Sequence, residues 1–273
     1  MSQNPLQQYF RQPKIYVKLP SQGMYSKPGA IAGDINGLPV YGMTGMDEII
    51  MKTPDSLLSG ESIAQVIKSC CPGIINPWEL TVLDTDMLFS AIRIATYGNL
   101  MTVTHTCFKC KTENEYDLDL NRVVEYFSSC KYDNNIVLEN MLIKTQPLTY
   151  KQSTMFSLKN FSLQQRLSQA EKLENKDEQQ KIVNELFKEL AVLQNELYFL
   201  SIESVEVGNT VVDQKDFIKE WLENCDKSVF DAVKKQIDKN RGTWTTPPFP
   251  VKCTACDTSV NLRVDLDQSN FFV

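Results

Sequence analysis

Histidine is almost absent from this sequence: His105 is the single one among 273 residues. A Ser-His-Asp triad or a Cys-His pair would have to use that residue, and an H-E-x-x-H zinc site cannot be built at all. The sequence also lacks the G-x-x-x-x-G-K-[ST] and G-x-G-x-x-G motifs, so no nucleotide cradle is visible. We interpret His105 as a strand residue that faces a neighbour; the alternative is a metal ligand. We therefore predict that the protein is not an enzyme.

Excess positive charge and long apolar runs are lacking as well. The formal net charge is −6 and the sequence pI is about 5.0, whereas a protein that binds the nucleic-acid backbone needs clustered Lys and Arg. The most apolar stretch, residues 87–98, is too short to span a bilayer and carries Arg93. The first residues have neither the basic nor the apolar region of a secretory signal. We therefore expect a cytoplasmic protein that binds neither nucleic acid nor membrane.

Cysteine, in contrast, occurs eight times. In a reducing compartment these side chains are free thiols or metal ligands more often than disulfides. Two pairs share the C-x-x-C spacing, and their surroundings read CFKCKTENEYDLDL over 107–120 and CTACDTSVNLRVDL over 253–266. When the two segments are aligned without a gap, they also match at a threonine and at an Asp-Leu pair. In both, apolar residues then alternate as in a half-buried strand, which indicates two halves of one module.

Two C-x-x-C knuckles that are each followed by a strand are typical of a zinc ribbon. We predict one structural zinc ion per chain, with every coordination position filled by protein, and the ligands Cys107, Cys110, Cys253 and Cys256. Closing the long loop between the halves costs about 4 kcal/mol, whereas the apparent affinity for zinc supplies about 10–16 kcal/mol. The alternative is a rubredoxin-like iron site, but Lys111 and Asp257 replace the glycine that usually follows such knuckles.

The other cysteines are interpreted as buried or half-buried structural thiols: Cys70, Cys71, Cys130 and Cys225. Cys70 and Cys71 are adjacent, so a redox pair is the alternative reading for them.

The pattern of apolar residues and turn residues predicts an α+β fold with a discontinuous ribbon module. We expect a mixed N-terminal region over 1–98, a zinc ribbon formed by 99–120 and 243–267, a mainly helical insertion over 121–242, and a tail over 268–273. Within the first region, residues 1–13 are expected to be an arm that is disordered or becomes ordered on binding. A helix that ends at Gly98 is expected to be capped by Asp84 or Thr85.

Two apolar features are candidates for partner contacts. Within the insertion, apolar residues recur at steps of three and four, and polar 174–180 indicates a helical hairpin or a break. This leucine stripe is either intramolecular core, which we favour, or a surface that packs on a partner helix: Ile182, Leu186, Leu190, Leu193, Leu197 and Leu200. The second feature either folds back onto the core or anchors in a pocket of a neighbouring protein: Phe271, Phe272 and Val273.

Several phrases together resemble a known family: YVKLPSQGMYS near the start, then MTGMDE, TPDSLLSGE and IRIATYG, and a cysteine knuckle. The chain resembles the baseplate proteins of T-even-type contractile-tailed bacteriophages, described as baseplate hub subunits or hub-assembly proteins. The resemblance covers residues 15–125, and the second knuckle fits it, whereas 145–242 could not be assigned by it.

The resemblance implies a non-enzymatic structural protein of the baseplate hub that binds other hub proteins or the tape measure protein, as part of an oligomeric assembly. It would occupy the host cytoplasm during assembly and the virion tail baseplate afterwards. A transient assembly chaperone that is not retained in the virion is the alternative. A zinc-ribbon regulator of nucleic acid is disfavoured by the acidic composition, and an enzyme with an unfamiliar site comes third.

Overall fold

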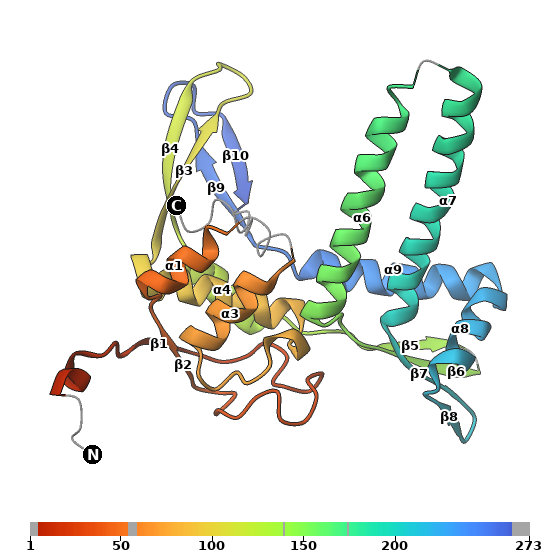
Figure 1. Cartoon of the computed structure of the whole chain (residues 1–273), viewed down its shortest axis with the longest axis horizontal. Helices are drawn as coiled ribbons and strands as arrows, with labels where there is room; N and C mark the ends of the chain where they lie inside the picture. The colour runs from red at the N-terminus through yellow and green to blue at the C-terminus, as the bar shows by residue number, and fades with distance from the viewer. Residues whose placement is uncertain (1–4, 54–58, 139, 174, 264–273) are drawn as a thin grey trace. The chain divides into compact units, whose positions relative to one another are not determined.

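The chain folds into two compact units, each a mixture of helices and small antiparallel sheets. The computed structural model describes residues 5–53, 59–138, 140–173 and 175–263 (Figure 1). One unit contains Met1–Lys131 and Trp244–Val273, and the other contains Tyr132–Thr243. The predicted mixed helix-and-sheet class is therefore confirmed.

The first unit joins an N-terminal helical part to two β-hairpins that come from distant parts of the chain. Its sheets are the antiparallel pairs β1–β2, β3–β4 and β9–β10. The two latter hairpins extend beside one another (Figure 1). In chain order its elements are η1 (Pro5–Tyr9), β1 (Pro13–Val17), β2 (Leu38–Tyr41), α1 (Gly45–Met51), α3 (Glu61–Cys70), η2 (Pro77–Glu79), α4 (Val82–Tyr97), β3 (Leu100–Thr106), β4 (Glu113–Asp119), α5 (Asn121–Ser129), β9 (Pro248–Lys252) and β10 (Ser259–Arg263).

Helix α4 is the centre of this unit, because buried residues occur on more than one of its faces. It contacts β1, β2, α3 and α5. The predicted cap at Asp84 or Thr85 is wrong: the helix begins earlier, since the Thr81 hydroxyl accepts a hydrogen bond from the Asp84 N–H at 3.1 Å. The Asp84 carboxylate instead accepts from the Ser21 N–H at 3.0 Å and from the Thr81 hydroxyl at 2.7 Å. The helix ends at Gly98 as predicted.

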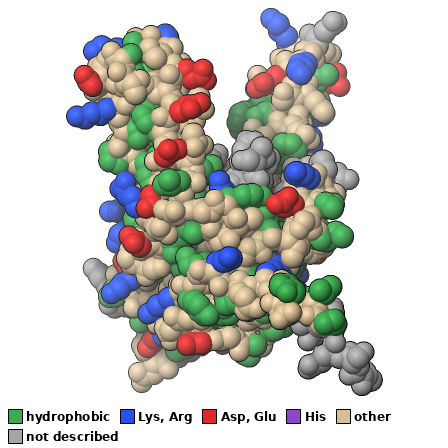
Figure 2. Space-filling view, turned by 90° about the vertical axis from the view of Figure 1, so that its left-hand side faces the viewer, with side chains coloured by type: hydrophobic (Ala, Val, Ile, Leu, Met, Phe, Trp, Pro, Cys, Tyr) green, Lys and Arg blue, Asp and Glu red, His purple; other side chains and the backbone are tan. Residues whose placement is uncertain are grey.

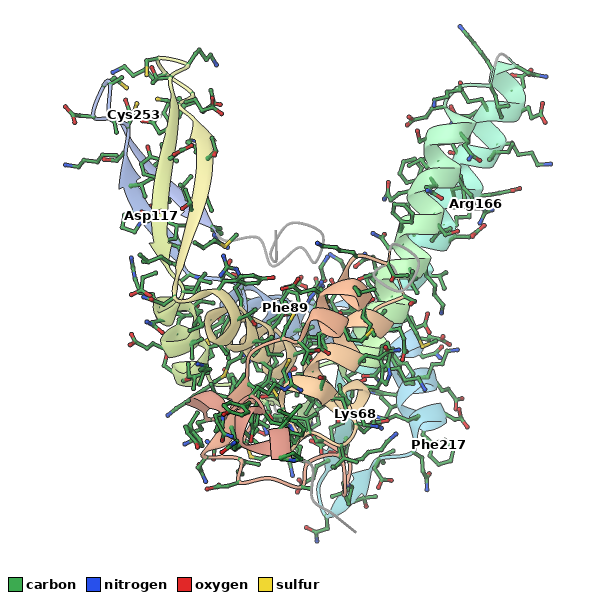
Figure 3. All side chains as sticks on the ribbon, turned by 60° about the vertical axis from the view of Figure 1, so that its left-hand side comes forward. Lys68, Phe89, Asp117, Arg166, Phe217 and Cys253 are labelled. Atoms are coloured by element: carbon green, nitrogen blue, oxygen red, sulfur yellow. The ribbon has the colours of Figure 1, made fainter. Side chains whose placement is uncertain are left out.

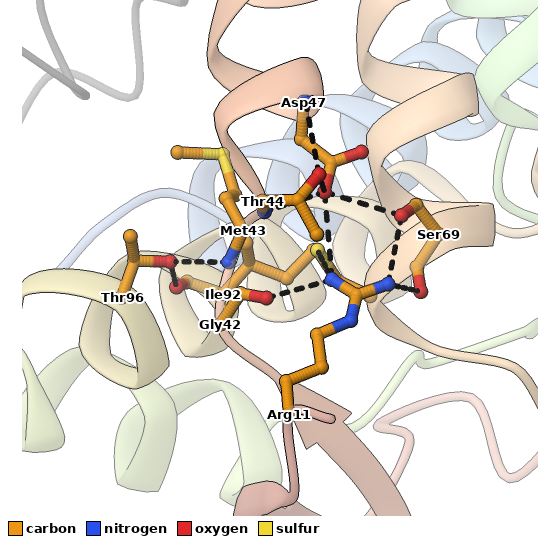
Figure 4. A network of polar contacts seen from close by, with 9 residues as sticks. Arg11, Gly42, Met43, Thr44, Asp47, Ser69, Ile92 and Thr96 are labelled. Atoms are coloured by element: carbon orange, nitrogen blue, oxygen red, sulfur yellow. Dashed lines mark hydrogen bonds and ion pairs between the residues drawn. The ribbon is translucent and has the colours of Figure 1, made fainter. Parts of the chain in front are cut away.

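Arg11 ties the start of the chain to the helices of the first unit (Figure 4). Its guanidinium donates to the carbonyl oxygens of Gly42 and Ser69, both at 2.7 Å, and to the carboxylate of Asp47 at 3.4 Å. Asp47 is 4% exposed, and its carboxylate also accepts from the N–H of Thr44 at 2.7 Å. One cation thus satisfies a buried carboxylate and the carbonyl end of α3. Within the expected arm over residues 1–13, the described residues form η1 and the contacts of Arg11, and the expectation that the arm is disordered or becomes ordered on binding stays a prediction.

We predict that Arg11→Ala destabilises the first unit by about 2 kcal/mol, because it leaves the buried Asp47 carboxylate without its cation. Urea unfolding of the full chain, combined with hydrogen exchange of the amides in α1 and α3, measures this loss. Lys27→Ala is the control, since Lys27 pairs with Glu79 at 3.0 Å but its side chain is 74% exposed; it should change stability by less than about 0.5 kcal/mol. Equal effects of the two substitutions would contradict the assigned role.

The second unit contains a helical hairpin, a four-stranded sheet and two further helices. The antiparallel sheet has the order β5-β6-β7-β8. In chain order the elements are β5 (Asn135–Leu138), β6 (Met141–Thr145), α6 (Tyr150–Ala170), α7 (Lys176–Leu200), β7 (Ile202–Val207), β8 (Thr210–Val212), α8 (Lys215–Asn224) and α9 (Lys227–Thr243).

One face of this sheet forms a core with the helices. Ile136, Ile143 and Val205 occupy neighbouring positions in the strand register, and they cluster with buried residues of α7, α8 and α9. The sequence did not lead us to expect β7 and β8. Their signal was present, because apolar and polar residues alternate over Val205–Val207 and Gly208-Asn209 forms a two-residue turn between the strands.

The leucine stripe of α7 is intramolecular core, as we favoured. Leu186 and Leu193 are buried against Leu163 and Ala170 of α6, and Leu197 belongs to the core around the sheet. The predicted helical hairpin is also confirmed, since α6 and α7 contact one another along their lengths and α7 begins within the polar segment 174–180.

Candidate metal centre

The two C-x-x-C sequences form matching knuckles at the ends of two β-hairpins. The first connects β3 to β4, and the second connects β9 to β10. In each knuckle the carbonyl oxygen of the first cysteine accepts a hydrogen bond from the backbone N–H of the residue that follows the second cysteine. The N–H of Lys111 donates to Cys107 at 2.9 Å, and the N–H of Asp257 donates to Cys253 at 3.0 Å. A second bond joins the N–H of each of these two cysteines to the carbonyl of the threonine that follows, at 2.9 and 3.0 Å. The internal repeat in the sequence is therefore a structural repeat.

Both knuckles hold a residue in the left-handed backbone region. Lys111 has φ 63° and Asp257 has φ 52°. Glycine adopts this conformation without strain, whereas a residue with a side chain is held there at a free-energy cost of about 1–2 kcal/mol. At the position where such knuckles usually have glycine, the backbone is thus still left-handed, although the residue is lysine in one knuckle and aspartate in the other. The departure from the usual sequence does not alter the turn.

The four sulfur atoms converge on one point between the hairpins (Figure 3). All lie within 4.8 Å of one another; Sγ of Cys107 is 3.7 Å from that of Cys256, and Sγ of Cys110 is 3.6 Å from that of Cys253. A tetrahedral ion with metal–sulfur bonds of about 2.3 Å requires sulfur–sulfur separations of about 3.8 Å. A disulfide would require about 2.0 Å, and all four cysteines are free. These residues are therefore placed to hold one metal ion.

The hydrogen bonds within the knuckles favour thiolates, which are the metal-binding form of cysteine. The hydroxyl and backbone of Thr112 lower the pKa of the Cys110 thiol to about 6. The backbone of Ala255 lowers the pKa of Cys253. At Cys256, Thr258 acts in the same direction, but burial and the neighbouring thiols outweigh it and raise the pKa. Four thiols this close cannot all ionise easily without a cation among them.

Asn114 joins the two knuckles, and sequence reasoning did not single it out. It is 3% exposed. Its amide nitrogen donates to the carbonyl of Thr112 at 2.9 Å and lies 3.5 Å from Sγ of Cys253, while its oxygen accepts from both the N–H and the hydroxyl of Thr254, at 2.9 and 2.7 Å. The repeat contains one sequence signal, because the matching residue in the second half is Val260. Because the repeat has an apolar residue at this position in its second half, the polar side chain of Asn114 indicates a specific hydrogen-bond partner.

The remaining candidate residues do not join this cluster. His105 lies in β3 opposite Asn114, and the group of potential ligands in the described part of the chain consists of the four cysteines. Cys70 and Cys71 are buried in the first unit. Burial, together with nearby Asp47, raises the pKa of Cys70 to about 11, and burial also raises the pKa of Cys71. Thiols with raised pKa values are poor nucleophiles, which agrees with a structural interpretation.

Cys130 and Cys225 are half-buried, and burial raises the pKa of both, so they too fit the structural interpretation. The predicted anchor residues Phe271, Phe272 and Val273 lie outside the described residues. No helix in the described ranges is long and apolar enough to cross a membrane.

The fold and the site define a mixed α+β protein whose first unit has a candidate four-thiolate metal centre. A family model described as T4 bacteriophage base plate protein matches residues 45–273. The chain belongs to this family of phage baseplate proteins. The match continues through the helical insertion, to which the resemblance had not extended. A search of the curated proteins and a search of the solved structures found no match.

We predict that the purified protein carries about one metal ion per chain and that Cys253→Ser loses it, because three thiolates hold the ion poorly. The variant should be destabilised by several kcal/mol. Elemental analysis and thermal unfolding measure both effects. Cys225→Ser is the control, since that thiol lies in the second unit and should leave the metal content unchanged. A folded protein without metal would contradict this prediction.

Asn114→Ala should keep the metal ion but bind it about 10–100-fold more weakly, because the residues that orient metal ligands contribute effects of this size. Competition with a chromophoric chelator measures the affinity. Asn261→Ala removes the same side chain from an exposed position of β10 and should have no effect. Unchanged affinity in Asn114→Ala would show that the two knuckles hold the ion without this connection.

Proposed function

We propose that this protein is a structural component of the baseplate hub that acts through protein–protein contacts and does not catalyse a reaction. Membership of the phage baseplate family over residues 45–273 is the observation that carries the proposal. A further support is the composition of the candidate metal centre. The four ligands of the candidate metal centre leave no position for substrate or water, which is the pattern of structural metal sites.

We further propose that the ion is zinc. Four cysteine ligands at tetrahedral spacing suit zinc, which holds this geometry in structural sites. A zinc ion with four thiolates carries a formal charge of about −2. Three exposed lysines adjoin the ligands in sequence and partly offset it: Lys109, Lys111 and Lys252. Elemental analysis distinguishes zinc from the iron of a rubredoxin-like site.

The partners that fit this role are other hub proteins and the tape measure protein, met during assembly in the host cytoplasm. A regulator of nucleic acid is disfavoured by the net charge of −6. On the face shown in Figure 2, basic and acidic side chains are interspersed, and the described residues there form no continuous basic patch. Binding to the nucleic-acid backbone needs such a patch.

Mass spectrometry of purified phage particles and of infected-cell lysate tests the proposal. A structural hub component should be present in the particle at a fixed ratio to other tail proteins, because it is held by the assembled structure. A protein found in the lysate but not in particles would instead be the assembly chaperone, and would contradict the proposed role. A known capsid protein and a known non-structural protein of the same phage serve as controls.

A further inference from the structure

The second unit begins and ends at neighbouring points of its own fold. The chain enters this unit at Tyr132 and leaves it at Thr243. Next to the entry, the backbone of Asp133 is bound by the last turns of α9, although Asp133 and Asn240 are separated by 107 positions in sequence. The entering and the leaving segments are therefore held together within the unit.

Asn240 makes most of this connection. Its Oδ1 accepts a hydrogen bond from the N–H of Asp133 at 3.2 Å, and its Nδ2 donates to the carbonyl oxygen of Asp133 at 2.8 Å. Asn240 is 3% exposed. Gln236, one turn earlier on the helix, donates to the same carbonyl oxygen at 2.8 Å. Both backbone groups of Asp133 are thus paired with side chains of α9, as buried backbone groups require.

The next residue is bound on its other side by the sheet. The carbonyl oxygen of Asn134 accepts from the N–H of Thr145 at 2.7 Å and from its hydroxyl at 3.2 Å, and Thr145 is fully buried at the end of β6. Lys239 adds an ion pair with the Asp133 carboxylate at 3.1 Å, but both side chains are more than half exposed, so this pair contributes little. The buried hydrogen bonds, rather than the ion pair, fix the entering segment.

The apolar core of the second unit lies entirely within the segment that these bonds enclose. Its two clusters of buried residues fall between positions 136 and 237, whereas the bonds join positions 133 and 240. A segment that has its own core and adjacent ends has the properties of an independently folding domain inserted into another.

We propose that Asp133 and Asn240 form a clasp that closes the second unit on itself, so that this unit folds and unfolds independently of the first. The clasp also shortens the loop between the two knuckles. Of the 143 positions that separate Cys110 from Cys253, 107 lie between the two clasp residues. With these folded away, closure of the remaining loop is about eightfold more favourable on the logarithmic rule. This inference goes beyond the proposed role in the baseplate hub and does not depend on it.

Hydrogen exchange of the full chain at a series of urea concentrations tests the proposal, because it follows each helix and strand separately. Asn240→Ala should accelerate exchange about tenfold or more in β5, β6 and α9, since it removes buried hydrogen bonds to both backbone groups of Asp133. The amides of α1, α3 and α4 should be unchanged. Arg11→Ala should do the reverse, because Arg11 binds only within the first unit.

Lys239→Ala is the matched control. It removes a contact of the same helix with Asp133, but only the exposed ion pair, so exchange should change less than about twofold. Gln236→Ala removes one hydrogen bond and keeps Asn240; it should accelerate exchange in the same amides to an intermediate degree, and it serves where Asn240→Ala unfolds the second unit outright.

Faster exchange in both units together, in either Asn240→Ala or Arg11→Ala, would show that the chain unfolds as one body and would overturn the proposal. So would an effect of Asn240→Ala no larger than that of Lys239→Ala. Loss of protection throughout the second unit of Asn240→Ala, with the first unit still protected, would support it.

Discussion

The convergence of four cysteine sulfur atoms is the constraint on which the first unit depends. Its chain leaves at Lys131 and returns at Trp244, with the whole second unit between these residues. The returning segment contributes one hairpin, and that hairpin meets its counterpart at the sulfur cluster, where Cys110 and Cys253 lie 143 positions apart in sequence. Bringing such distant segments together costs conformational entropy. A metal ion held by these four cysteines would repay that cost at a single point, because metal binding is coupled to folding.

The strands that carry the knuckles contribute few buried apolar side chains, Leu118 in β4 and Phe249 in β9. Along β3 and β10 exposed and half-buried residues alternate, and neither strand contains a fully buried side chain. An isolated two-stranded hairpin is marginally stable in water. The helical part of the same unit is different, since α4 is buried on several faces and Arg11 joins α1, α3 and the start of the chain. The core therefore stabilises the helices, and the cluster of four cysteines joins the hairpins.

The sequence predicted the parts of this site that depend on local spacing. The C-x-x-C pairs, the strand after each pair and the helix that ends at Gly98 follow from spacing and residue type. Sequence alone could not identify Asn114 as the connection between the knuckles, because its partner Thr254 is adjacent in space and 140 positions away in sequence. The cap at Thr81 was missed for a related reason: Asp84 is a good capping residue by type, but the fold buries it and uses its carboxylate to bind Ser21.

The insertion illustrates how one sequence pattern serves two purposes. The apolar stripe of α7 packs on α6, and this accounts for the three- and four-residue repeat that the sequence shows. The hollow between α6 and α7 is lined in part by the same stripe, because Leu193 belongs to both, whereas Val192 lines it from outside the stripe.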